Sequence, residues 1–259
     1  MERLTASTVT VVGLGGVGSW TAEALCRSGI GNLVLVDLDD ICISNTNRQL
    51  HATSPTIGEM KLDVMKRRLL DINPQCNVTL IHDFVSTENV YNILDMCGNM
   101  TGLIDAMDGM KEKTALLAAC VKRRIPIVTC AGAAGRTDPT KIMVDDLTRV
   151  TEDRLLASCR KSLRKNYNFE RGLSLAERKK SSSKNQRKWN ILAVFSTEVQ
   201  QKVCQNSSTS SLRRCDGPMG TACYVTGTYG FIAASKMVEM IAKNELIIPR
   251  TQEAKSSLS

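Results

Sequence analysis

The sequence predicts an α/β fold in which helices cover both faces of a mostly parallel sheet, with a smaller C-terminal extension. Short apolar runs alternate with longer amphipathic segments over residues 8–130, which is the pattern of βαβ units. Hydrophobic residues make up 42% of the chain and aromatic residues only 4%, so the core is aliphatic, as in a covered parallel sheet. The first apolar run leads into a glycine-rich turn that opens a helix. These three observations predict a Rossmann-like domain.

The elements of the first half follow one another in regular order. The expected strands are residues 8–13, 33–37, 77–82, 102–106 and 126–130. The expected helices are residues 16–28, 59–72, 87–96 and 110–123. Asn73-Pro74 ends the second of these helices, because the residue before a proline is driven out of the helical conformation. Right-handed crossovers between successive strands then give a parallel sheet.

The second half is less regular. We expect short strands at residues 141–144 and 191–195, a basic helix at 150–165 and a long C-terminal helix at 221–243. Residues 171–188 and 205–212 are rich in Ser, Thr or Lys and are expected to be loops. We therefore treat residues 1–259 as one domain, with a basic and flexible insertion at 160–190.

The formal charge of +8 is concentrated in that insertion. Residues 160–188 contain eleven Lys or Arg and two acids, a net charge of +9, which leaves the remaining chain near −1. Such a block indicates a polyanionic partner, most often nucleic acid, and the alternative is a solvated loop. The residues expected to contact nucleic acid are Arg160, Lys161, Arg164, Lys165, Arg178, Lys179 and Lys180.

The glycine turn and the acid that follows it predict a nucleotide site. Glycines at positions 13, 15, 16 and 18 let the backbone turn tightly and approach a phosphate, while the helix N-terminus supplies free N–H groups. Asp37 ends the next strand, nineteen residues after Gly18, where its carboxylate can accept hydrogen bonds from ribose hydroxyls. Strand, turn, helix and acid in this order are much more specific than the glycines alone.

Further charged residues follow the strand ends. Arg48, Gln49 and Lys61 lie downstream of Asp37, and cations there suit a triphosphate. Asp108 can hold Mg²⁺, which proteins bind through one or two carboxylates together with phosphate oxygens. Three alternatives stay open: Lys61 as a solvent-facing helix residue, Arg48 in a loop salt bridge, and Asp108 as a helix N-cap.

The cysteine spacing and the hydrophobic pattern indicate which kinds of site and which location to expect. None of the ten cysteines forms a Cys-x-x-Cys pair, so the usual zinc spacing is absent, and we expect most to be reduced, buried thiols. The chain shows neither a signal peptide nor a membrane span. We therefore expect a cytoplasmic protein, with a mitochondrial location as the alternative.

The motifs resemble the ATP site of the ubiquitin-activating-enzyme-like adenylyltransferases, the superfamily of the molybdopterin and thiamine enzymes of the ThiF family. The resemblance rests on residues 13–18, Asp37-x-Asp39, Asn45-x-Asn47-Arg48-Gln49, Lys61 and Asp105-x-x-Asp108. Three further stretches are similar to the tRNA threonylcarbamoyladenosine dehydratases: Thr46–Ala52, Ala131–Thr140 and Val194–Glu198.

The resemblance implies an ATP-dependent ligase or cyclase that modifies tRNA. It would adenylate the threonyl carboxylate of threonylcarbamoyladenosine and close the ring with loss of water. Gly13, Gly15, Gly16 and Gly18 would form the phosphate turn, Asp37 would bind ribose, and Asp39 and Asp105 would complete the nucleotide site. Asn45, Arg48, Gln49 and Lys61 would hold the triphosphate, with Arg48 reaching across the interface of a homodimer, and Asp108 would bind Mg²⁺.

The candidate catalytic residues are Arg48, Lys61, Asp108 and Cys215. Cys215 is only a candidate: the Arg213-Arg214 pair could lower the pKa of its thiol, and the alternative is an inert thiol. Three other functions remain open. They are an adenylyltransferase that activates the C-terminus of a ubiquitin-like or sulfur-carrier protein, a nicotinamide-dependent reductase, and a catalytically silent scaffold that binds tRNA or a partner.

Overall fold

A computed structural model describes residues 1–171, 188–199 and 220–250. Several expectations fall on residues outside these ranges. They are the loops expected within 172–187 and at 205–212, the nucleic-acid contacts of Arg178, Lys179 and Lys180, and the thiol of Cys215. All other predicted elements lie in the described part of the chain.

The strands form one seven-stranded sheet in the order β3-β2-β1-β4-β5-β7-β6. All neighbouring pairs are parallel except β6 and β7, which are antiparallel. The strands are β1 (Thr8–Val12), β2 (Asn32–Asp37), β3 (Asn77–His82), β4 (Gly102–Asp105), β5 (Ile127–Cys130), β6 (Ile142–Asp146) and β7 (Leu192–Ser196). The predicted mostly parallel sheet is confirmed.

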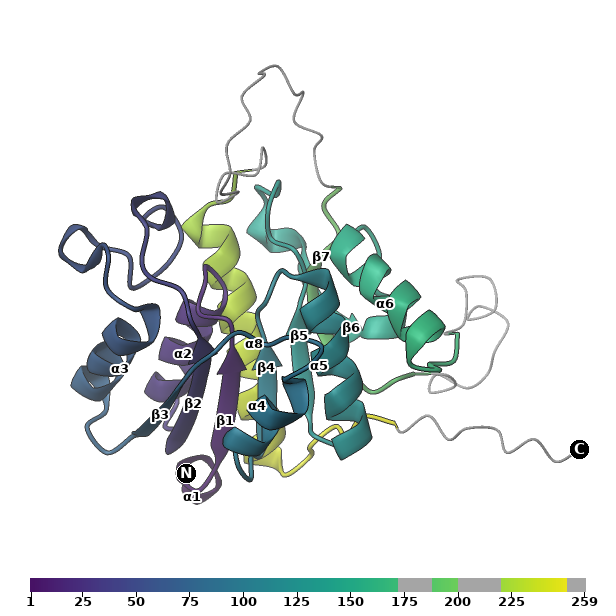
Figure 1. Cartoon of the computed structure of the whole chain (residues 1–259), viewed down its shortest axis with the longest axis horizontal. Helices are drawn as coiled ribbons and strands as arrows, with labels where there is room; N and C mark the ends of the chain where they lie inside the picture. Colours follow the sequence, from purple (N-terminus) through teal and green to yellow (C-terminus); the bar gives the residue numbers. More distant parts are fainter. Residues whose placement is uncertain (172–187, 200–219, 251–259) are drawn as a thin grey trace, which may run out of the picture.

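Helices cover both faces of this sheet (Figure 1). The helices are α1 (Glu2–Thr5), α2 (Gly18–Arg27), α3 (Lys61–Ile72), α4 (Val90–Met96), α5 (Met110–Arg123), α6 (Arg154–Asn166) and α8 (Cys223–Lys243). Helix α8 packs against α2 and against strands β4, β5, β6 and β7 on one face, while α4, α5 and α6 pack side by side on the other. The buried side chains are mainly aliphatic, as the composition predicts.

The strand order fixes where a ligand can bind. After β1 the chain builds outward through β2 and β3, and it then returns to β4 on the other side of β1. In an open parallel sheet, the loops that diverge at such a reversal leave a crevice at the carboxyl ends of the strands. The loops after β1 and β4 are therefore the natural walls of a site, and they carry the glycine turn and Asp108.

Several helices begin later than the sequence predicts, and for two of them the structure shows the reason. Helix α3 begins at Lys61, because Met60 forms an isolated antiparallel bridge with Asp40. Helix α6 begins at Arg154, because the Asp153 side chain accepts a hydrogen bond from the backbone N–H of Leu156 and caps the helix there.

Helix α1 is an element that the sequence does not predict. It has only four residues, and no apolar period can be recognised over so short a stretch. Its one buried side chain, Leu4, joins the core, and the Arg3 guanidinium donates a hydrogen bond to the carbonyl oxygen of Ala242, 2.9 Å away. No helix among residues 1–171, 188–199 and 220–250 is long and apolar enough to cross a membrane.

Candidate functional site

The turn between β1 and α2 requires glycine at two positions. Gly13 has φ +88°, in the left-handed region that side chains rarely adopt. A Cβ atom on Gly18 would overlap the carbonyl oxygen of Gly13. The turn is therefore closed so tightly that α2 begins directly against the end of β1, which places the N-terminus of the helix at the carboxyl end of that strand.

Asp37 at the end of β2 holds this turn. One oxygen of its carboxylate, Oδ2, accepts a hydrogen bond from the backbone N–H of Leu14 at 2.5 Å, and the other, Oδ1, accepts one from the N–H of Asp39 at 2.9 Å. A carboxylate oxygen can accept more than one hydrogen bond, so Asp37 keeps acceptor capacity for a ribose. The predicted ribose ligand is thus also part of the frame of the turn.

Lys61 is buried and paired, so the alternative of a solvent-facing helix residue is wrong. Its ammonium lies 2.6 Å from Oδ2 of Asp39, and the side chain of Lys61 is only 6% exposed while that of Asp39 is 50% exposed. The backbone N–H of Lys61 also donates to the carbonyl oxygen of Asp39 at 3.1 Å. The first residue of α3 is therefore fixed beside the end of β2, with its charge next to the glycine turn.

The segment that follows η1 (Ile43–Asn45) carries Arg48 and Gln49 to the same place. The Arg48 guanidinium donates to the carbonyl oxygen of Ser44 and to Oδ1 of Asn47, and it forms no salt bridge with a carboxylate of the described residues. The Arg48 side chain lies against Gly16, because a Cβ there would stand 3.2 Å from Cγ of Arg48.

Asn45 and Gln49 are the buried amides of this segment. Oδ1 of Asn45 accepts the backbone N–H of Cys42, and the carbonyl oxygen of Asn45 accepts the N–H of Arg48 and of Gln49. Gln49 is 8% exposed, and its buried Oε1 has no hydrogen-bond partner among the described residues. Because a buried acceptor without a donor is costly, this atom is a natural contact for a ligand.

The two acids predicted after β4 lie in different environments. Asp105 is fully buried, and its Oδ2 accepts hydrogen bonds from the Lys113 ammonium at 2.6 Å and from the Thr129 hydroxyl at 2.7 Å. Asp108 is exposed, and it is not the N-cap of α5, because Gly109 occupies that position. The structure thus gives Asp105 internal partners and leaves the Asp108 carboxylate open to solvent at the crevice.

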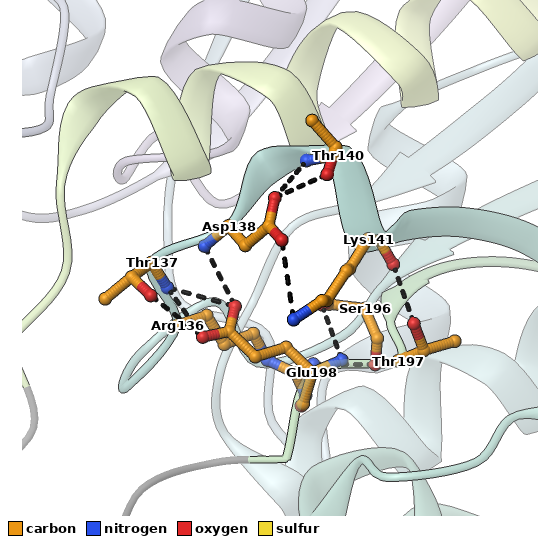
Figure 2. A network of polar contacts seen from close by, with 8 residues as sticks. All are labelled: Arg136, Thr137, Asp138, Thr140, Lys141, Ser196, Thr197 and Glu198. Carbon is orange, nitrogen blue, oxygen red and sulfur yellow. Dashed lines mark hydrogen bonds and ion pairs between the residues drawn. The ribbon is translucent and has the colours of Figure 1, made fainter.

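Arg136 joins two of the stretches that resemble the dehydratases (Figure 2). This guanidinium is 2% exposed and pairs with Asp153, with a distance of 2.8 Å from NH2 to Oδ2. Its remaining hydrogen bonds go to the carbonyl oxygens of Gly132, Glu152, Ser196 and Glu198. Arg136 therefore ties the loop after β5 to the end of β7 and to the start of α6.

Glu198 completes this junction from the other side (Figure 2). Its carboxylate accepts hydrogen bonds from the backbone N–H of Asp138 and from the N–H and hydroxyl of Thr137, at 2.9 to 3.2 Å. These donors, with the N–H of Asp138 foremost, hold the pKa of Glu198 below its usual value. Neither Arg136 nor Glu198 could be recognised as a clamp from the sequence, because their partners are far apart along the chain.

The remaining stretch, Thr46–Ala52, is connected to the loop after β5 through the residues that precede α8. The Asn47 side chain donates to the carbonyl oxygen of Thr221 at 2.8 Å, and the Thr221 hydroxyl donates to that of Ala133 at 3.5 Å. The backbone N–H of Gly135 donates to the carbonyl oxygen of Gly220. Thr46–Ala52, Ala131–Thr140 and Val194–Glu198 are therefore connected around the residues that precede α8.

The predicted basic contacts in the described residues lie on α6. Leu156, Cys159 and Leu163 form the buried face of this helix, while Lys161, Arg164 and Lys165 are exposed. Arg160 is half-buried and donates to the carbonyl oxygen of Leu147. The helix thus offers a basic face to solvent, while the separation of 160–190 as a flexible insertion stays a prediction.

The residues at the sheet edge fit a nucleoside triphosphate. Gly13 and Gly18 let the turn close tightly, Lys61 and Arg48 flank it, and Gln49 offers a buried acceptor oxygen to a ligand. Within the described ranges, no three His, Cys, Asp or Glu side chains gather as a metal-binding group. Asp108 fits the mode in which Mg²⁺ is held by few carboxylates together with phosphate oxygens.

This combination of parallel sheet, glycine turn and strand-end acid defines a nucleotide-binding α/β protein of the Rossmann-like class. A family model described as the ThiF family matches residues 1–256. A tRNA threonylcarbamoyladenosine dehydratase from Haemophilus influenzae is 42% identical over 247 residues, which cover 95% of this chain and 89% of that protein. The Escherichia coli enzyme of the same name is 40% identical over 245 residues, 91% of this chain and 86% of its own length.

Solved structures agree with these relatives. The structure of the Escherichia coli dehydratase in complex with ATP has a TM-score of 0.80 and 36% identity, covering 94% of this chain and 88% of that one. Its complex with AMP has a TM-score of 0.79 and 37% identity. This chain belongs to the tRNA threonylcarbamoyladenosine dehydratases of the ThiF family. The family, the fold and the enzyme class predicted from the motifs are confirmed.

Proposed function

We propose that this chain uses ATP to cyclise threonylcarbamoyladenosine in tRNA, with overall loss of water. The observation that carries the proposal is the site at the carboxyl ends of β1, β2 and β4, where Lys61 and Arg48 flank a glycine turn held by Asp37. The support from relatives is that the enzymes of this name cover the chain almost end to end, and that one of them has been solved with ATP and with AMP.

The residues of the site divide the work by their chemistry. ATP supplies the activation of the threonyl carboxylate as an adenylate, on which the carbamoyl group then closes. Asp37 accepts the ribose hydroxyls, and the N–H groups at the start of α2 face the phosphates. Lys61 and Arg48 place positive charge where negative charge develops as pyrophosphate leaves. The Lys61 ammonium would then contact both the Asp39 carboxylate and the phosphates.

The proposal includes Mg²⁺, a homodimer and tRNA bound through the basic face of α6. Asp108 would hold Mg²⁺ together with phosphate oxygens, because its carboxylate is exposed beside the glycine turn. The side chains of Tyr224 and Phe231 on α8 are 55% and 50% exposed, and they supply apolar surface for a second copy. Arg160, Lys161, Arg164 and Lys165 would contact phosphates of the tRNA.

A single-turnover assay tests the proposal. The chain is mixed with ATP, Mg²⁺ and tRNA that carries threonylcarbamoyladenosine, and nucleoside mass spectrometry follows the loss of one water. We expect a product that requires ATP and falls by about a hundredfold or more in Arg48→Ala, because a positioned cation stabilises the developing charge. Light scattering on the same preparation is expected to give twice the chain mass of 28.4 kDa.

The exposed Arg67→Ala is the matched control, because this arginine pairs with Glu59 away from the turn. The proposal fails if wild type binds ATP and this tRNA but releases no dehydrated nucleoside. Pyrophosphate exchange that depends instead on a ubiquitin-like or sulfur-carrier protein would assign the chain to protein activation.

A further inference from the structure

The side chain of His51 is buried against the glycine turn, and the proposed chemistry leaves it without a role. It is 2% exposed, and its Nε2 lies 2.7 Å from the carbonyl oxygen of Leu14. Because a carbonyl can only accept, Nε2 carries the proton and donates it. Nδ1 of His51 is buried and finds no hydrogen-bond partner in the described part of the chain, which agrees with a neutral ring.

Both backbone polar groups of Leu14 are held by hydrogen bonds. The N–H of Leu14 donates to Asp37, and the carbonyl oxygen of Leu14 accepts from His51. Leu14 itself is fully buried, so water cannot replace either bond. The first residue after Gly13 is therefore fixed from two directions, by the end of β2 and by the segment that carries Arg48 and Gln49.

Two neighbouring bonds fix the register of that segment on α2. The Ser19 hydroxyl donates to the carbonyl oxygen of Gly15 at 2.7 Å and accepts the backbone N–H of Leu50 at 3.2 Å. The Trp20 indole N–H donates to the carbonyl oxygen of Arg48 at 3.0 Å. We call Ser19, Trp20 and His51 the latch, because their hydrogen bonds hold residues 48–51 against α2 and the glycine turn. Arg48 then lies against Gly16.

We propose that His51 is a positioning residue of the nucleotide site, which sets the Gly13–Gly18 turn and the Arg48 segment in the register that binds the triphosphate. The inference rests on the proposed function, since it assumes that ATP occupies this turn. His51 does not touch the ligand; it acts through the Leu14 peptide. A shift of the turn would misplace the N–H groups and Arg48 together, which weakens phosphate binding more than it changes later steps.

Substitutions at His51 separate this role from a contribution to packing. Gln places an amide N–H close to the position of Nε2, while Leu fills the space but donates nothing. We expect His51→Leu to raise the Kd and KM for ATP by about tenfold, the effect of one lost buried hydrogen bond. His51→Gln is expected to stay within about threefold of wild type, and kcat to change less than KM in both variants.

Two more variants guard against simple loss of stability. Leu94→Ala empties a buried position on α4, on the other face of the sheet, and is expected to lower Tm without changing the Kd for ATP. Ser19→Ala removes the two hydrogen bonds of the Ser19 hydroxyl, to Gly15 and to Leu50, and is expected to weaken ATP binding in the same direction as His51→Leu. If His51→Leu does not fold, the ATP affinities of His51→Gln and Ser19→Ala test the positioning role instead: the first is expected to bind nearly like wild type and the second more weakly.

The measurements are calorimetric titration with ATP, steady-state kinetics, and deuterium exchange of residues 13–18 without ATP. Faster exchange of this turn in His51→Leu, restored in His51→Gln, is expected. The inference is overturned if folded His51→Leu binds ATP like wild type, or if a folded Gln variant binds no better than the Leu variant. If the wild type binds no ATP, the proposed function is refuted. The exchange data would still show whether His51 holds the Gly13–Gly18 turn in place.

Discussion

At the scale of single residues, a fully buried ion pair lies beneath the site. Lys113 on α5 and Asp105 at the end of β4 form an ion pair in which both side chains are fully buried. The Thr129 hydroxyl on β5 donates to the same carboxylate oxygen. This cluster links two neighbouring strands to the helix that crosses between them, so its task is to hold the floor of the crevice.

Removing one member of this pair leaves a buried charge uncompensated. We expect Lys113→Met to lower the free energy of unfolding by about 3–5 kcal/mol, measured by urea denaturation. The exposed Lys122→Met on the same helix is the control, with an expected effect of no more than about 0.5 kcal/mol. An equal, small effect of both variants would show that the Lys113–Asp105 pair does not stabilise the fold.

Some site residues could be predicted from the sequence and others could not. Asp37 and Lys61 are found beside the glycine turn, because strand ends of a parallel sheet share one edge. His51, Arg136 and Lys113 act through contacts with backbone or side chains that are distant along the chain. Such contacts have no period or spacing in the sequence. Folding of the chain brings these residues and their partners together.

At the scale of elements, α6 separates its charges from its apolar face. Leu156, Cys159 and Leu163 recur at helical spacing and pack inward, which leaves Lys161 and Lys165 exposed on the outside. The helix is capped by Asp153, which also pairs with Arg136. The basic face is thus held in a fixed relation to the Arg136 clamp and not merely tethered to it.

Reversing charge on α6 tests its contact with tRNA. We expect Lys161→Glu/Lys165→Glu to weaken tRNA binding at low salt and to reduce the slope of log K against log salt by about 1–2, because fewer counterions are released. Fluorescence anisotropy at several salt concentrations measures both quantities. Lys122→Glu, outside the basic segment, is the control, and an unchanged slope in the α6 variant would place the tRNA elsewhere.

The existence of each longer element was predictable, and the boundaries were less so. Apolar period and length identify β1 to β5 and α2 to α5. The start of α3 depends on the bridge between Asp40 and Met60, which is a tertiary contact. The four residues of α1 form a helix because Leu4 finds a buried site, and this too is decided by packing.

At the scale of the whole molecule, stability is linked to pH through His51. Burial, followed by the nearby positive charge of Lys61, keeps the pKa of this ring below its usual value of 6.5 despite the bond to Leu14. Between the lowered pKa and about 6.5, the unfolded chain binds more protons than the folded one. The free energy of unfolding therefore falls as the pH drops below about 6.5.

Urea denaturation at about pH 7.5, 6 and 5 measures this linkage. We expect wild type to lose more stability over that range than His51→Gln, which cannot titrate there. The carboxylates whose pKa is lowered, among them Glu23 and Glu198, lose their contribution only at lower pH, as they approach protonation. Parallel curves for the two proteins would show that protonation of His51 is not coupled to unfolding.

The position of β6 at the edge of the sheet affects how the protein behaves at high protein concentration. Among the described residues β6 pairs with β7 alone, so it presents a free hydrogen-bonding edge at one end of the sheet. The strand is only five residues long, ends in Asp145 and Asp146, and follows directly after Lys141. Short length and charge discourage another strand from adding to an edge. Edge-to-edge aggregation is therefore opposed at the flank of the sheet that lies farthest from β3.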